Sequence, residues 1–216
     1  MGTTERKERE RKRRKDRILN AAISLIEEKG FEKITMDEIA ERTELSKGTL
    51  YLYYNDKASL YQAIKKRALQ FLHDQFLDIL QKDLPGAKLV YEMMLTFLGL
   101  INENTTFTKA MMLYDKKNKD EHEAADHTIQ KDCIQLENEL LMLIVRSLQI
   151  GVQDGSIKNE LDPKLLALQI GFQMNGMIQF CLTGANKKGL QILDEKNMDL
   201  PDLMEQFLHT QFNQIE

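Results

Sequence analysis

Residues 34–57, ITMDEIAERTELSKGTLYLYYNDK, constrain the fold of this chain more than any other stretch. They contain the start signals of two short helices that lie only a few residues apart. Thr35 followed three positions later by Glu38 has the pattern of a capping box, and Ser46 is a favourable N-cap for the second helix. Two helices this close in sequence have to pack across a tight turn, so the stretch predicts a helix-turn-helix.

The residues between and behind these helices fit that interpretation. Ala40 is small enough to lie where the helices cross, and Leu45 can fill the corner between them. Leu50 and Tyr54 lie four apart on one face of the second helix, which predicts that both belong to the core. Glu44 stands at the turn position that favours a positive φ and usually glycine, so we expect a strain of roughly 1 kcal/mol there.

The outer face of the second helix has the chemistry of a nucleic-acid contact. Hydroxyls, amides and a cation near the N-terminal end of a helix suit the phosphates and base edges of a major groove. A glycine inside a helix costs about 1 kcal/mol relative to alanine, which is understandable if the backbone must approach DNA closely. The alternative is a short surface helix with a chance glycine. We favour DNA contact by the residues on the first two turns, which are Lys47, Gly48, Thr49, Tyr51 and Tyr53.

These motifs resemble the helix-turn-helix of the tetracycline-repressor (TetR) family of bacterial transcription regulators. The resemblance covers about residues 16–62 and rests on SKGTLY at 46–51, YYNDK at 53–57, and a preceding helix that ends at Gly30-Phe31. Glu44 in place of the usual Gly, and Leu52 at a position that is often aromatic or polar, depart from the family pattern. The resemblance implies DNA contacts by Thr35, Ser46, Lys47, Gly48, Thr49, Tyr51, Tyr53 and Lys57.

The charge distribution favours docking on DNA by one end of the protein. The net charge of the 216-residue chain is −4, but residues 1–17 contain nine Lys and Arg against four Asp and Glu. Residues 58–216 contain 16 basic and 22 acidic side chains. An acidic body with a basic tip is drawn to a polyanion by its tip. The basic segment at 6–17 has two interpretations: a phosphate-contacting arm that is disordered without DNA, or a solvated helical extension.

The remainder of the chain predicts an all-α protein. Only three prolines occur, each at a plausible helix start, and helices are expected over about 58–82, 86–102, 106–119, 122–153, 163–183 and 200–214. We expect two domains without a flexible joint: residues 1–62 form the helix-turn-helix domain with its basic arm, and residues 63–216 form a helical effector-binding and dimerisation domain. The boundary then lies inside or beside the 58–82 helix.

Two late helices have the apolar pattern of an interface. The 163–183 helix is apolar around its whole circumference, and the 200–215 segment follows an i, i+3, i+4, i+7 spacing. The alternative is a helix central to its own monomer. We favour a two-fold interface in a homodimer, formed by Leu165, Phe172, Phe180, Leu203, Met204, Phe207, Leu208 and Phe212.

The middle helices are rich in methionine and aromatic residues, which line adaptable apolar pockets. Ordinary core packing explains any single methionine equally well. As a set they predict a chamber for a small apolar effector, lined by Met93, Met94, Phe97, Met111, Met112, Tyr114, Met142, Phe172, Met174, Asn175 and Gln179.

Catalytic motifs, a cofactor site and a metal site are not expected. The sequence contains no nucleophile elbow, phosphate loop or CxxC motif, and DEHEAADH at 120–127 fits a solvated helix start better than a metal site. Cys133 and Cys181 form no spaced pair and are expected to be buried thiols in a reducing cytoplasm. The longest apolar run, residues 140–145, is far below membrane length.

The function that these patterns favour is a cytoplasmic, dimeric regulator that binds operator DNA and responds to a ligand. We expect it to be a repressor that a small apolar effector releases from its operator. The competing class is an all-helical small-molecule carrier or enzyme that retains the helix-turn-helix as a scaffold. Binding to duplex DNA with a steep salt dependence would distinguish the two classes.

Overall fold

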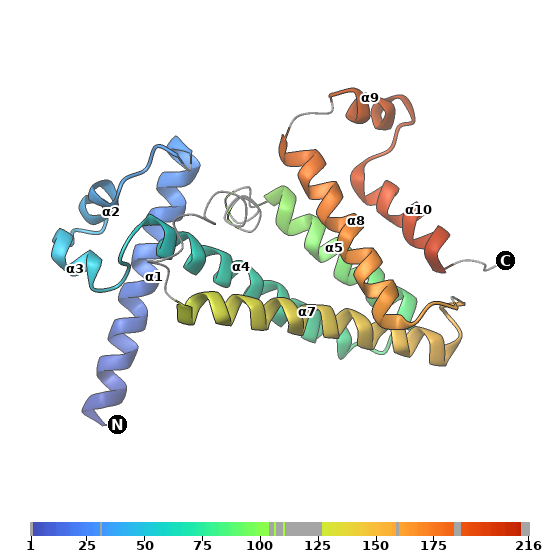
Figure 1. Cartoon of the computed structure of the whole chain (residues 1–216), viewed down its shortest axis with the longest axis horizontal. Coiled ribbons are helices and arrows are strands. Elements are labelled where there is room, and N and C mark those ends of the chain that lie inside the picture. Colours follow the sequence, from blue (N-terminus) through green and yellow to red (C-terminus); the bar gives the residue numbers. More distant parts are fainter. Residues whose placement is uncertain are drawn as a thin grey trace. The chain divides into compact units, whose positions relative to one another are not determined.

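The computed structural model describes residues 2–30, 32–103, 106, 110, 127–158, 160–183 and 187–212, with side chains throughout except at 3, 102, 103, 127, 177–183, 187–190, 200, 201, 204 and 209. All regular structure in these ranges is helical (Figure 1), which confirms the predicted fold class. The helices are α1 (Thr3–Lys29), α2 (Met36–Arg42), α3 (Lys47–Tyr51), α4 (Lys57–Leu80), α5 (Gly86–Glu103), α7 (His127–Asp154), α8 (Pro163–Thr183), α9 (Lys187–Glu195) and α10 (Leu200–Phe212).

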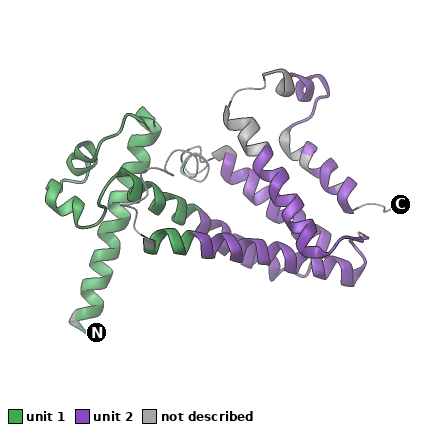
Figure 2. Ribbon diagram, viewed as in Figure 1, with its two compact units in different colours: residues 1–68, 105–133 green, residues 69–104, 134–216 purple. Residues whose placement is uncertain are grey.

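The predicted helix bounds agree with most of these elements within a few residues. The helix expected over 106–119 falls mainly outside the described residues. Helix α9 was not predicted, because it is only nine residues long and two glycines disguise it. Gly184 comes shortly before the helix in sequence and Gly189 lies within it, and glycine is typical of turns. The chain divides into two compact units (Figure 2), unit 1 from residues 1–68 and 105–133 and unit 2 from residues 69–104 and 134–216.

The basic segment at the start of the chain is the first half of α1. Of the two interpretations given above, the structure agrees with the helical extension, because residues 6–17 are helical. Arg14 donates to Glu10 at 2.7 Å, the i,i+4 pairing that supports an exposed helix. The second half of α1 turns apolar, and Ile18, Ala22 and Leu25 are buried in the core of unit 1.

That core holds the helix-turn-helix to α1 and to the start of α4. Ile39 and Ala40 from α2, Leu50 from α3, and Leu60 and Ile64 from α4 belong to one buried cluster. Tyr54 is buried in the same cluster with an exposed fraction of 3%. The predictions that Leu50 and Tyr54 are core residues and that Ala40 lies at the packed side of α2 are confirmed.

Unit 2 has a core of its own. Leu89, Val90 and Met93 of α5 are buried, as are Leu148 of α7 and Leu166 of α8. The start of α5 lies so close to the end of α7 that a Cβ on Gly86 would be 2.0 Å from the backbone nitrogen of Gly151. Asp154 accepts from the Gly86 amide at 2.8 Å and Ser156 from the Ala87 amide at 3.1 Å, so the end of α7 caps α5.

The turn after α2 has the predicted positive φ at Glu44, which is +55°. The Leu45 amide donates to Ala40 O at 2.9 Å and the Glu44 amide to Glu41 O at 3.0 Å. These two bonds define a Schellman motif with a glutamate at the left-handed position. The same pair of bonds closes α9, where Asn197 has φ of +50°. Asparagine tolerates this conformation better than glutamate does.

These two motifs generate a matched prediction on stability. We expect Glu44→Gly to raise the free energy of unfolding by about 1 kcal/mol, because glycine removes the left-handed strain and the Glu44 side chain makes no hydrogen bond or ion pair within the described residues. Asn197→Gly is the control and is expected to change it by less than about 0.5 kcal/mol. Urea denaturation followed by circular dichroism measures both. Equal effects of the two substitutions would contradict the assignment of strain to Glu44.

Candidate nucleic-acid interface

The first helix of the motif is fixed by the predicted capping box. The Glu38 amide donates to the Thr35 hydroxyl at 3.2 Å, and the Thr35 amide donates to Glu38 Oε2 at 2.9 Å. Lys29 Nζ lies 2.7 Å from Glu38 Oε1 and ties the end of α1 to this cap. The Lys29 bond, followed by the bonds from Thr35, lowers the pKa of Glu38 to about 2. The carboxylate therefore stays ionised at neutral pH and keeps the cap closed.

The turn between the helices is anchored from both sides. Thr43 is buried, and its hydroxyl donates to Ile39 O at 2.7 Å. Arg17 on α1 donates to Thr43 O at 2.5 Å. The last turn of α2 is therefore held by a guanidinium from a helix 26 residues earlier in the chain. The sequence gives no local indication of this contact.

The second helix begins at the predicted N-cap. The Thr49 amide donates to Ser46 Oγ at 3.2 Å, and the Ser46 and Thr49 hydroxyls lie 2.8 Å apart. Helix α3 has only five residues, and Leu52 closes it. Tyr53 was predicted to lie on the second turn of this helix. In the structure it follows the helix instead. It is partly buried and packs against the core of unit 1.

The outward face of α3 presents a small set of side chains to solvent. The side chain of Lys47 is 65% exposed, and Tyr51 is 45% exposed. A Cβ added to Gly48 would meet no atom of the described chain within 4 Å. Nothing within that part of the protein therefore requires glycine, although it disfavours helix by about 1 kcal/mol.

Lys47 is not a free cation in this structure. Its Nζ lies 2.6 Å from Asp37 Oδ2, and Asp37 raises the pKa of Lys47. Both side chains are well exposed, so the pair contributes little to stability and can be replaced by a phosphate. Asp37 was not among the residues that the sequence pattern predicted for this surface. The only indication was its place in the first turn of α2, which the helix dipole alone explains.

The two remaining predicted contacts lie at the edges of the motif. Thr35 is exposed, but its hydroxyl is engaged in the α2 cap, where it also lies 3.0 Å from Glu38 Oε2. Lys57 Nζ donates to Glu32 O at 3.3 Å and lies 5.7 Å from the ring centre of Tyr61. The start of α4 is capped by Asp56, because the Ser59 amide donates to Asp56 Oδ1 at 2.6 Å.

The residues predicted to line an effector chamber occupy different environments in unit 2. Met93, Met94 and Met174 are buried, whereas Met142 is 53% exposed. Phe97 is partly buried and Asn175 is exposed. Burial alone does not show whether these side chains surround one space, so the effector chamber stays a prediction. Met111, Met112, Tyr114 and the side chain of Gln179 lie outside the described residues.

The predicted interface residues separate into two groups. Leu165 and Phe172 on α8 are 57% and 72% exposed, and Leu203 on α10 is 37% exposed. Phe207 is partly buried, and the side chains of Phe180 and Met204 lie outside the described residues. Leu208 and Phe212, however, are buried within the chain, because α10 packs on α5. Their apolar spacing reflects the core of unit 2, so the prediction that they contact a partner is corrected.

No metal centre or membrane span is found in the described parts of the chain. No three His, Cys, Asp or Glu side chains there come close enough to hold a metal ion, and no helix there is long and apolar enough to cross a bilayer. The segment at 120–126 and the His127 side chain, considered above for a metal, lie outside the described residues. Cys133 is buried, as predicted, and the Cys181 side chain is not described.

An all-helical chain whose N-terminal unit holds a capped helix-turn-helix, with its second helix outward, has the architecture of a DNA-binding regulator. The family of bacterial regulatory proteins, tetR family, matches residues 18–64, which cover the motif from the second half of α1 into α4. The match shows a helix-turn-helix domain of the tetR family in the N-terminal unit, and together with the relatives below it supports a TetR-family transcriptional regulator.

Relatives in two bacteria agree with this assignment. An uncharacterized HTH-type transcriptional regulator of Bacillus subtilis, YhgD, is 26% identical over 154 residues, 71% of this chain and 76% of YhgD. The biofilm operon icaADBC HTH-type negative transcriptional regulator IcaR of Staphylococcus aureus is 29% identical over 89 residues. That match spans 41% of this chain and about half of IcaR, 48%.

A solved structure shows that the fold extends over nearly the whole chain. The transcriptional regulator FadR of Bacillus subtilis, in complex with stearoyl-CoA, superposes with a TM-score of 0.67 over 93% of this chain and 98% of FadR. The sequences are 17% identical, so this comparison concerns the fold. The predicted all-α architecture is thus shared well beyond the helix-turn-helix.

Proposed function

We propose that this protein is a homodimeric repressor that binds operator DNA through α3 and leaves it when a small apolar molecule binds. The observation that supports the DNA contact is the outward face of α3, where Lys47, Gly48 and Tyr51 are exposed on a helix held by buried Leu50. Ser46 and Thr49 complete the set of hydroxyls at the helix start. A protein that binds an operator acts in the cytoplasm, where bacterial DNA lies.

Within this function, residues 1–62 are the DNA-binding domain and residues 63–216 are the effector and dimerisation domain. Repression as the mode of action is supported by IcaR, a negative regulator related to this chain over 89 residues. Thr35, Tyr53 and Lys57 flank α3 and serve as backbone contacts, which position a reading helix but do not specify bases.

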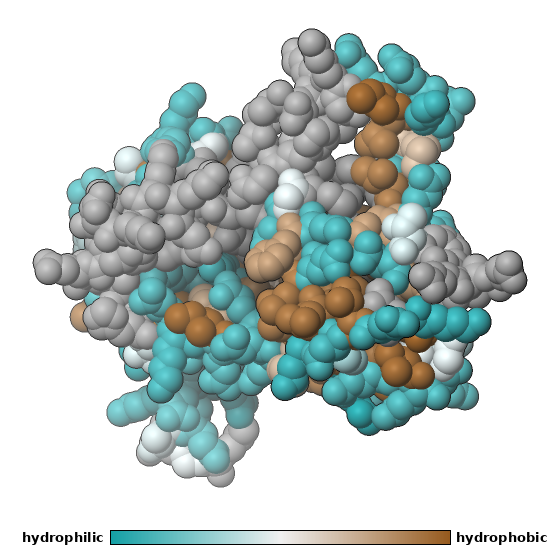
Figure 3. Space-filling view, turned by 45° about the vertical axis from the view of Figure 1, so that its right-hand side comes forward, coloured by the Kyte–Doolittle hydropathy of each residue, from teal (hydrophilic) through white to brown (hydrophobic). Residues whose placement is uncertain are grey.

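A homodimer supplies the two reading helices that an operator requires. Its support is the row of apolar side chains along α8, where Leu165 and Phe172 are more than half exposed and Leu168 is 41% exposed. These positions follow a three-and-four spacing and form one face of the helix. The face of the molecule in Figure 3 shows uncovered apolar side chains among hydrophilic ones. The revised interface is therefore Leu165, Leu168, Phe172 and Leu203, with Leu208 and Phe212 as core residues.

An apolar effector is supported by two features. Unit 2 is rich in methionine, and methionine cores adapt to ligands at little cost in packing. FadR, whose fold covers nearly the whole chain, is known in complex with stearoyl-CoA. We propose that the effector of this protein is a molecule of the same kind, with a long apolar chain, bound between helices of unit 2.

The DNA contact is tested with duplexes selected from a random-sequence library by rounds of binding to the protein. We expect Lys47→Ala and Tyr51→Ala each to weaken binding to the selected duplex by about 1–3 kcal/mol, and Lys47→Ala to lower the salt slope by about one unit. Fluorescence anisotropy at several salt concentrations measures both. Lys164→Ala removes the same charge from exposed α8 and is the control. Unchanged affinity in both α3 variants would refute α3 as the reading helix.

The dimer is tested by placing a charge on α8. We expect the wild-type protein to sediment at about twice its 25.1 kDa mass, and Phe172→Glu to shift it to a monomer, since a carboxylate buried without a partner costs several kcal/mol. Phe71→Glu is the matched control, because Phe71 is also exposed, at 47%, but lies on α4. A dimer that tolerates Phe172→Glu at micromolar concentration would exclude this face.

Effector release is tested on the complex with the selected duplex. We expect stearoyl-CoA or a related long-chain molecule to weaken DNA binding by about 1–3 kcal/mol, the usual range of coupling between two sites. Coenzyme A without an acyl chain is the control. Anisotropy of the labelled duplex during titration gives the result. A long-chain molecule that binds the protein but leaves DNA affinity unchanged would show that its site is not an effector site.

A further inference from the structure

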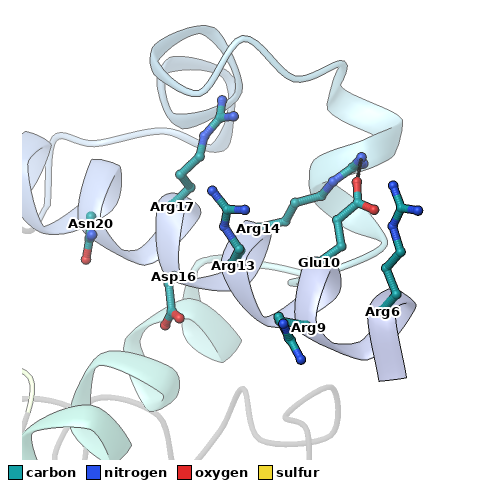
Figure 4. Close-up of a pocket in the computed structure, with 8 residues that line it drawn as sticks. All are labelled: Arg6, Arg9, Glu10, Arg13, Arg14, Asp16, Arg17 and Asn20. Atoms are coloured by element: carbon teal, nitrogen blue, oxygen red, sulfur yellow. Dashed lines mark hydrogen bonds and ion pairs between the residues drawn. The ribbon is translucent and has the colours of Figure 1, made fainter. Parts of the chain in front are cut away.

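The first half of α1 carries a surface that the helix-turn-helix does not account for. A hollow of about 700 Å³ lies along it, lined by Arg6, Arg9, Glu10, Arg13, Arg14, Asp16, Arg17 and Asn20. Arg6, Arg13, Arg14 and Arg17 extend to one side of the helix, and Asp16 extends to the other (Figure 4). We call these four arginines the arginine face.

The arginine face is continuous with the proposed DNA-binding motif. Arg17 donates to Thr43 at the end of α2, and a smaller hollow is lined by Arg14, Arg17, Glu44 and Leu45 at the turn. Arg14 also approaches Tyr53, which follows α3. Glu10 chiefly, and Tyr53 to a smaller extent, raise the pKa of Arg14. From Arg17 the face runs back along α1 to Arg6, about 16 Å at the rise of an α-helix.

Two members of this face have their charges available. Arg14 is paired with Glu10 and Arg17 with a carbonyl, but the guanidinium groups of Arg6 and Arg13 meet no acidic side chain within ion-pair distance among the described residues. Both side chains are exposed. A planar guanidinium offers two parallel N–H donors, which match the oxygens of a phosphate.

The charge of the rest of the chain gives this face a particular importance for binding a polyanion such as DNA. Residues 18–57, which include the whole helix-turn-helix, contain five basic and eight acidic side chains, a net charge of −3. Residues 58–216 are also acidic, with 16 basic and 22 acidic side chains. Only residues 1–17 are net positive, at +5. Net attraction to the phosphate backbone is therefore expected chiefly from residues 1–17.

The chemistry of the surface fits DNA better than a protein partner. All eight residues that line the hollow are charged or polar, so it offers no apolar or aromatic anchor of the kind on which protein partners depend. Protein–DNA interfaces are polar and strongly basic. A position beside α3 places the face against the same duplex.

We propose that the arginine face of α1 is a second DNA-contacting element, which binds backbone phosphates beside the site that α3 reads. This inference rests on the proposed DNA-binding function. It assigns affinity for DNA and discrimination between sequences to different helices. The arginine face supplies affinity that is independent of sequence, and α3 supplies discrimination between sequences.

The test compares two double variants with equal loss of charge from the same stretch of helix. Arg6→Gln/Arg13→Gln removes the available members of the arginine face, and Arg11→Gln/Lys12→Gln removes two exposed charges from other sides of α1. Glutamine favours helix, so α1 is expected to remain intact, which circular dichroism verifies. The probe is a fluorescein-labelled duplex of random sequence, about 40 base pairs long and thus several helical turns.

We expect Arg6→Gln/Arg13→Gln to lower the salt slope of binding by about 1.8 units, at about 0.9 per phosphate, and the affinity by roughly 10- to 60-fold near 0.1 M salt. The control pair should lower the slope by less than about 0.5 unit. The ratio of affinities for the selected and random duplexes should stay unchanged in both. Equal slopes in the two double variants would overturn the inference.

Failure of the inference is distinguishable from failure of the proposed function. If the wild-type protein binds neither the selected nor the random duplex, operator binding itself is wrong. If wild type binds and Lys47→Ala weakens it, but the arginine-face variant and its control behave alike, only the role of α1 is wrong. Ethylation interference gives a direct reading, because phosphates contacted by Arg6 and Arg13 should lose their effect in the double variant.

Discussion

The burial of Leu50 in the core of unit 1 is the interaction on which the functional end of this molecule depends. A five-residue helix such as α3 is far too short to form alone in water, because nucleation costs more than its few hydrogen bonds return. Its geometry is therefore set by what it packs against. Leu50 is fully buried, Tyr54 nearly so, and the Ser46 cap fixes the start of the helix. The outward residues can then be chosen for contact alone, which explains how Gly48 is tolerated at a position with open space around it.

Much of this end could be predicted from sequence because its determinants are local. Thr35 with Glu38 and Ser46 with Thr49 are pairs three residues apart, and both form the expected bonds. The positive φ of Glu44 also follows from local turn chemistry. The contacts that escaped prediction join distant segments. Arg17 reaches Thr43 across 26 residues, and Asp37 reaches Lys47 on the next helix. Tyr53 was misplaced because the end of a very short helix depends on tertiary packing and not on a stop signal.

In unit 2 the same kind of reasoning could not separate core from interface. An apolar stripe shows that a helix face is buried, but it does not show whether the same chain or a partner covers it. Leu208 and Phe212 are covered by their own chain, whereas Phe172 has an exposed fraction of 72%. Methionines are subject to the same ambiguity, because Met93 is buried beside Ser147 Oγ at 3.6 Å while Met142 lies exposed on α7. Periodicity identified the helices in each case, and only three-dimensional packing assigned their faces.

The distribution of charge in unit 1 gives a reason for the proposed division, in which sequence reading and phosphate attraction lie on different helices. A lysine on a reading helix that attracted every phosphate strongly would favour non-specific DNA as much as the operator. In this structure Lys47 donates a hydrogen bond to Asp37. A phosphate or a base can accept a bond from Lys47 only by displacing the Asp37 carboxylate. Such a pair lowers the general attraction of α3 for DNA and leaves its shape and hydrogen-bonding groups to discriminate. Arg6 and Arg13 of α1 have no carboxylate partner to displace among the described residues. They lie on a long helix whose second half is fixed in the apolar core of unit 1. Affinity can thus be adjusted by substitutions in the first turns of α1 without disturbing the buried cluster that orients α3.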